Sequence, residues 1–202
     1  MSTWTSKVIL AGLAFGLAAC GAALNVTRNA PMQVQLTDGL IVAGARGWCV
    51  DESTSRARDG TTVIVLGSCA AIAGNALLPK PSVEGVLTIA VEDEAETTPD
   101  VDSLAAFLSS TQGRALLARD GQASSISLLE MSKSEDALFL HALDQSGAPR
   151  SAAEDYWRAL FDIDGRFVTI SLITLADRPI SRRQGLRTLN AQVDRLKAAN
   201  AL

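Results

Sequence analysis

The sequence predicts an α+β fold, an antiparallel β-sheet with two helical segments packed on it. Three observations support this class. Runs rich in β-branched residues recur along the chain. An Asp-Gly pair joins two of these runs. Two further segments place apolar residues at helical spacing. A chain of 202 residues suits one domain, and its net charge of −4 gives no electrostatic reason to expect nucleic acid as a partner.

The first half of the chain is expected to supply several strands. Residues 40–43 and 48–50 form a first strand region, interrupted by a bend at 44–47. Residues 61–66 are expected to form a central strand, because both of their faces are apolar. Pro79 and Pro81 interrupt regular structure, and 83–91 forms the next strand.

The first helical segment lies in the middle of the chain. Leu104, Phe107, Leu108 and Thr111 recur at helical spacing, with Asp102 or Ser103 as the expected cap. Residues 114–119 are expected to add one or two turns, which end at Gly121.

Two hairpins follow. Residues 125–131 and 137–143 are expected to pair. Asp164-Gly165 predicts a type I′ turn, because both central positions need positive φ. Side chains alternate across a strand, so one face of this second hairpin is expected to be core and the other to point outward. The expected core face holds Trp157, Ala159, Phe161, Val168, Ile170 and Leu172, and the outward face holds Arg158, Asp162, Thr169 and Ser171.

The last helix follows Pro179. Ser181 and Gln184 match a capping box. Its apolar stripe is Leu186, Leu189, Val193 and Leu196. The helix is locally basic, with Arg182, Arg183, Arg187, Arg195 and Lys197. A solvated face is the simpler interpretation, and a docking surface for an acidic partner or lipid headgroups is the alternative.

The amino-terminal residues match a secretory signal. The apolar run 8–18 is shorter than the roughly 20 residues that a spanning helix needs. Leu17-Ala18-Ala19-Cys20 resembles the lipobox of bacterial lipoproteins. That resemblance implies cleavage before Cys20 and attachment of diacylglycerol and a fatty acid such as palmitate to that residue. The expected organisation is a signal peptide at 1–19, a flexible tether at 20–37 and one α+β domain at 38–202.

Cys49 and Cys69 remain once Cys20 carries lipid. Each ends an apolar run, and neighbouring strands would bring their Cβ atoms within bonding reach in an oxidising compartment. We predict a Cys49–Cys69 disulfide. Two buried thiols or a metal pair are the alternatives, but further metal ligands are missing nearby.

Catalytic and cofactor motifs are missing. The acidic residues between Glu92 and Asp102 lack the spacing of an EF-hand and suit a solvated loop that leads into a helix. His141, the single histidine, lies within a strand, where packing is its commoner role. The sequence has no nucleophile elbow, nucleotide loop or metalloprotease motif. We therefore expect no catalytic residue, cofactor or metal.

The order of elements resembles the PsbP-like fold, and the segments at 47–51, 67–71 and 156–158 are similar to proteobacterial lipoproteins. The resemblance implies a non-catalytic, membrane-associated binding or assembly module that faces the periplasm and has an envelope protein as its partner. Gly21 after Cys20 favours the outer membrane over the inner membrane by the same resemblance. The alternatives are a periplasmic hydrolase using Ser68 or an aspartate with His141, and a carrier of a metal or small ligand.

Overall fold

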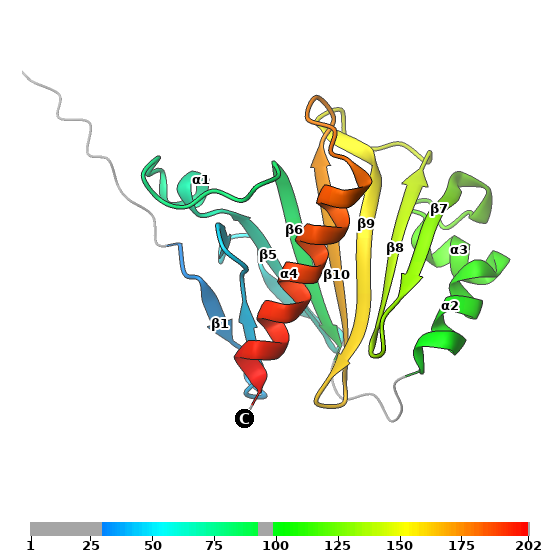
Figure 1. The fold of residues 1–202 in the computed structure, drawn as a ribbon, viewed down its shortest axis with the longest axis horizontal. Coiled ribbons are helices and arrows are strands. Elements are labelled where there is room, and N and C mark those ends of the chain that lie inside the picture. Colours follow the sequence, from blue (N-terminus) through cyan, green and yellow to red (C-terminus); the bar gives the residue numbers. More distant parts are fainter. Residues whose placement is uncertain (1–29, 93–98, 202) are drawn as a thin grey trace, which may run out of the picture.

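A computed structural model describes residues 30–92 and 99–201 of the chain. Its centre is a large, wholly antiparallel sheet with the strand order β3-β5-β6-β10-β9-β8-β7, and β4 also pairs with β5 (Figure 1). These strands are β3 (Trp48–Val50), β4 (Arg56–Arg58), β5 (Thr61–Ser68), β6 (Gly85–Glu92), β7 (Ile126–Lys133), β8 (Ala137–Asp144), β9 (Ala152–Ile163) and β10 (Arg166–Leu175). The α+β class and the antiparallel sheet are thus as predicted. β5 is interior, as its two apolar faces predict, because β6 lies on one side of it and β3 and β4 on the other.

The hairpin of β9 and β10 forms in the expected register. Asp164 and Gly165 both have positive φ, 54° and 77°. Ile163 pairs with Arg166, and Trp157 pairs with Leu172. The alternation of β-branched and aromatic residues, together with the turn, therefore sufficed to fix this part of the sheet.

The described residues form four α-helices: α1 (Cys69–Ala73), α2 (Val101–Ser109), α3 (Thr111–Leu117) and α4 (Arg182–Asn200). Helix α4 covers one face of the sheet, and α2 and α3 cover the other face mainly at β7 and β8, so the predicted outward face is outward only in part. Phe139 of β8 joins the core cluster under α4, whereas its neighbours Leu138 and Leu140 join the cluster under α2 and α3. Because neighbouring side chains of a strand point to opposite faces, the helices lie on opposite sides of the sheet.

The face with Arg158 is therefore partly buried, with Ser171 buried and Arg158 and Thr169 half-buried. Burial lowers the pKa of Arg158, whose Nε donates a hydrogen bond to the Ser171 hydroxyl at 3.0 Å. Tyr156, on the same face, donates its hydroxyl proton to the Leu117 carbonyl of α3 at 3.0 Å. Asp162, near the turn, is exposed as expected.

Helix α4 crosses the other face of the sheet diagonally (Figure 1). Its capping box forms as predicted, with Ser181 and Gln184 each bonding the backbone of the other. The buried Gln192 side chain accepts a hydrogen bond from the Ala45 amide at 2.9 Å and donates one to the Ala43 carbonyl at 2.7 Å. These bonds dock α4 on the segment that leads into β3.

The folded part begins before the expected boundary at residue 38. β1 (Gln33–Gln35) pairs with β2 (Ile41–Ala43) as a separate two-stranded sheet. The Pro31 carbonyl accepts a hydrogen bond from the Val50 amide at 2.8 Å. Residues 31–37 thus belong to the body and not to a free tether, although their small and polar composition suggested one.

Helix α2 contains Leu104, Phe107 and Leu108 as predicted, but Thr111, expected on the same helix, begins α3, and α3 ends at Leu117 and not at Gly121. The residue that caps α2 is Asp100, and not Asp102 or Ser103 as predicted. Its carboxylate accepts hydrogen bonds from the backbone amides of Asp102 and Ser103. Gly113 permits the tight turn into α3, since a Cβ there would lie 2.1 Å from the Phe107 carbonyl oxygen.

Candidate functional site

The candidate site lies beside a disulfide at one end of the sheet. The sulfur atoms of Cys49 and Cys69 are 2.05 Å apart, which is the length of a disulfide bond. β3 pairs with β5 so that Trp48 lies opposite Ser68, and Cys69 follows as the first residue of α1. The predicted pair is therefore at bonding distance, and it joins β3 to the start of α1.

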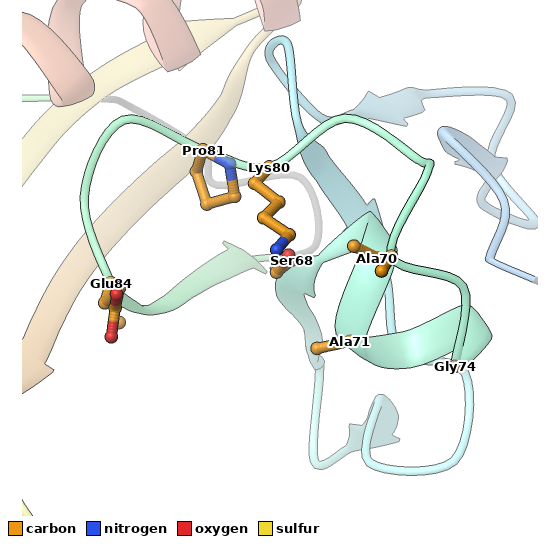
Figure 2. A pocket seen from close by; sticks show the side chains of 9 residues that line it. Ser68, Ala70, Ala71, Gly74, Lys80, Pro81 and Glu84 are labelled. Atoms are coloured by element: carbon orange, nitrogen blue, oxygen red, sulfur yellow. The ribbon is translucent and has the colours of Figure 1, made fainter.

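An open pocket of about 540 Å³ lies against this joint. Most of its lining is small and apolar, from Ala70, Ala71, Ala76 and Pro81, and its polar side chains are Ser68, Lys80 and Glu84. Figure 2 shows the Lys80 side chain extending toward Ser68. Apolar walls with a few convergent polar groups are typical of small-molecule and peptide sites.

Two local features hold Lys80 in this position. Lys80 stands between Pro79 and Pro81, and the rings of these prolines restrict the backbone. Gly47 packs directly on it, since a Cβ at Gly47 would lie 2.4 Å from the Lys80 carbonyl carbon. The Gly47 carbonyl also accepts a hydrogen bond from the Cys69 amide at 3.0 Å. The disulfide, α1 and the loop of Lys80 therefore form one connected unit.

Sequence reasoning did not single out Lys80. The pattern that could have pointed to Lys80 is Pro79-Lys80-Pro81, because two prolines fix the backbone around a cationic side chain. That signal suggests function only when the loop is known to face Ser68, and the fold supplies this information.

The structure does not bring Ser68 and His141 together. Ser68 ends β5, whereas His141 lies on β8, and β6, β10 and β9 separate the two strands. Four strand spacings correspond to roughly 19 Å. A proton transfer between these side chains needs hydrogen-bond distance, directly or through one water molecule.

His141 instead packs against its neighbours on β9. Its Nε2 lies 2.9 Å from the Asp155 carboxylate. Its ring stacks on Trp157 with 4.2 Å between the ring centroids. The packing role expected for this histidine is therefore the one that its contacts describe.

The acidic segment is described only in part, since residues 93–98 lie outside the described residues. Asp100 caps α2, and Asp102 forms an ion pair with Lys133 at 2.6 Å. In the ranges 30–92 and 99–201, no three histidine, cysteine or acidic side chains gather as a metal site.

Cys20 and the rest of the predicted lipobox lie outside the described residues. Within the part of the chain that is described, no helix has the length and apolarity needed to cross a membrane. No protein-family model matches this chain, and no curated protein is similar to it.

Proposed function

We propose that this protein is a lipid-anchored binding or assembly module of the cell envelope. Acyl chains on Cys20 hold it to a membrane on the periplasmic side, with the outer membrane favoured. The body has a PsbP-like architecture and binds an envelope protein partner through the pocket beside the disulfide.

The pocket is the observation that carries this proposal. It combines apolar walls, the polar groups Ser68 and Lys80, and a backbone that the disulfide and two prolines hold in place. A preformed site loses less conformational entropy on binding than a flexible one. Leu77, in the loop beside the pocket, is 94% exposed and offers an apolar contact to a partner.

The Cys49–Cys69 pair supports the proposed compartment. Structural disulfides form and persist in oxidising compartments such as the periplasm. The Cys49–Cys69 bond is such a structural disulfide, since it joins two elements of the body. Two acyl chains would give stable anchoring, whereas a single chain gives only marginal membrane binding.

A hydrolase is the second candidate, with Lys80 in the place that the sequence suggested for His141. Ser–Lys pairs act as nucleophile and base in some hydrolases. A lysine acts as a base when its surroundings desolvate the ammonium group, and Lys80 is exposed. The geometry therefore favours binding. If Ser68→Ala retains partner binding and no ester or peptide hydrolysis depends on Ser68, the binding module is supported.

Filling the pocket tests the proposal. Ala71 is exposed on α1 and lines the pocket, so Ala71→Trp should block the site without disturbing the core. Ala106, exposed on α2, provides the matched control Ala106→Trp on another helix. After crosslinking in native membranes, the wild-type protein and Ala106→Trp should capture the same protein, and Ala71→Trp should lose it. Equal capture by all three proteins would contradict the pocket as the binding site.

A further inference from the structure

A second hollow, next to the pocket, is lined by cations from three separate parts of the chain. Arg46 comes from the turn between β2 and β3, Lys80 from the loop before β6, and Arg187 from α4. We call this the basic hollow. Its volume is about 410 Å³, and its other lining residues are Ala45, Trp48, Ser82, Thr188 and Ala191.

The three cations are unpaired within residues 30–92 and 99–201. Arg46, Lys80 and Arg187 are exposed and take part in none of the ion pairs of this part of the chain, where other cations, such as Arg182 and Lys197, have carboxylate partners. The lining contains no carboxylate from the described residues. Like charges that converge on one hollow repel each other, and an anion bound between them would relieve that repulsion.

Helix α4 adds to the positive charge at the cost of its own stability. Its first turn contains no acidic residue and two arginines, of which Arg182 pairs with Glu130 and Arg183 takes part in none of the ion pairs of the described residues. Negative side chains stabilise the start of a helix and positive ones do not. Arg187 also lines a second depression on α4, together with Arg182, Arg183 and Leu186. This charge pattern is therefore better suited to an external anion than to the helix itself.

The basic hollow lies next to the point where the amino-terminal segment joins the body. Pro31 and Met32 accept hydrogen bonds from Val50 and Gly44, which flank the turn of Arg46. From Cys20 to Pro31 the chain can extend at most roughly 40 Å. An acyl group on Cys20 would therefore keep Pro31, beside the basic hollow, within roughly 40 Å of the membrane surface, which allows the hollow to reach the lipid headgroups.

We propose that the basic hollow binds the phosphate monoester of a membrane lipid headgroup, as in phosphatidic acid. A phosphate monoester carries a charge of about −1.5 to −2 at neutral pH and has three acceptor oxygens, which suits three cations better than a carboxylate does. Arginine can bind phosphate through two parallel hydrogen bonds, and Arg46 and Arg187 approach from different elements. This site is separate from the pocket of the proposed function. The inference rests on the proposed function in one respect, since the membrane anchor places the lipid phosphate within reach.

The first arm of the test measures phosphate recognition without a membrane. The full chain in a neutral detergent is titrated with glycerol phosphate by calorimetry. We expect saturable binding that weakens about tenfold in Arg46→Gln and in Arg187→Gln, because each loses a charged hydrogen-bond donor. Arg56→Gln, at an exposed arginine of β4, is the matched control and should bind like the wild type. Thermal melting checks that all variants fold. Absence of saturable binding, or equal weakening in Arg56→Gln, would overturn the proposal.

The second arm tests the lipid source. Hydrogen exchange of the full chain is compared in nanodiscs of phosphatidylcholine alone and with added phosphatidic acid. Amides of the Arg46 turn and of the Lys80 loop should be protected by phosphatidic acid, and glycerol phosphate should reverse this protection. Binding of glycerol phosphate in the first arm with no effect of phosphatidic acid would overturn the headgroup as the source. A chain that carries no lipid would refute the anchor of the proposed function, while the first arm would still decide whether the hollow binds phosphate.

Discussion

Asp144 is a buried carboxylate that joins two loops. It accepts hydrogen bonds from the Arg119 and Ser146 amides, each at 3.0 Å, and pairs with the Arg119 guanidinium at 3.4 Å. Burial raises the pKa of Asp144, but the hydrogen bonds from Ser146 and Arg119 and the charge of Arg119 outweigh burial, so the net shift is downward from 3.8. The ionised form is therefore the one that the fold stabilises.

Asp144→Ala should destabilise the protein by about 2 kcal/mol, because it leaves the part-buried amides of Arg119 and Ser146 without their acceptor. Since the folded pKa is the lower one, the contribution of the ionised carboxylate is complete above pH 3.8 and disappears as the pH falls toward the folded pKa. Urea unfolding of both proteins between neutral pH and pH values below 3.8 measures this, and the difference should narrow with acid. If the difference in the free energy of unfolding between the wild type and Asp144→Ala grew as the pH fell, Asp144 would not be stabilised in its ionised form.

Gly185 lets α4 approach the sheet closely. A Cβ at this position would lie 2.3 Å from two atoms of the Trp157 indole ring, which is fully buried. Gly185→Ala should therefore destabilise the protein by about 3 kcal/mol through overpacking, although alanine favours helices. Chemical denaturation measures the change. Asp194→Ala, at an exposed position of the same helix, is the control and should change stability little. If Gly185→Ala were as stable as this control, α4 would not pack against Trp157 as closely as described.

At the scale of elements, the disulfide holds β3, α1 and the loop of Lys80 together. The loop that it closes spans 20 residues along the chain. Replacing both cysteines with alanine should lower the free energy of unfolding by about 3 kcal/mol in the chain-entropy model. Partner capture and binding of glycerol phosphate should both weaken, because the Gly47–Lys80 contact loses its support. Unchanged stability and binding would show that the joint does not position the site.

The hairpin of β9 and β10 shows what local sequence can predict. Its turn needs two positive φ angles, which Asp164-Gly165 provides, and its apolar alternation allows one register. The final helix was equally predictable, since Ser181 and Gln184 mark its start and its apolar stripe is regular. These features depend on residues that are close together in the sequence.

Contacts between distant segments were not predictable in this way. The face with Arg158 and Ser171 looked polar, but α2 and α3 cover part of that side of the sheet, and the arginine donates a hydrogen bond to the serine. β1 was missed because its pairing with β2 and the bond from Val50 to Pro31 are tertiary. For the same reason, the cysteine pair could be expected from two neighbouring strands, whereas the meeting of Arg46, Lys80 and Arg187 could not.

At the scale of the molecule, the described body gathers its candidate binding features at the end where the amino-terminal segment joins. The pocket, the disulfide and the basic hollow share the loop of Lys80, and β3, which lies beside them, is bonded to Pro31. His141 and Asp155 lie on the far side of β6 and β10 and contribute to neither hollow. An anchor at Cys20 would therefore attach the body at the end that carries the binding surface.

The mass of the protein purified from native membranes decides whether Cys20 anchors it. We expect a polypeptide that begins at Cys20 and carries diacylglycerol and a further acyl chain, with Cys49 and Cys69 oxidised. A product that retains residues 1–19, carries no lipid and has free thiols would contradict it.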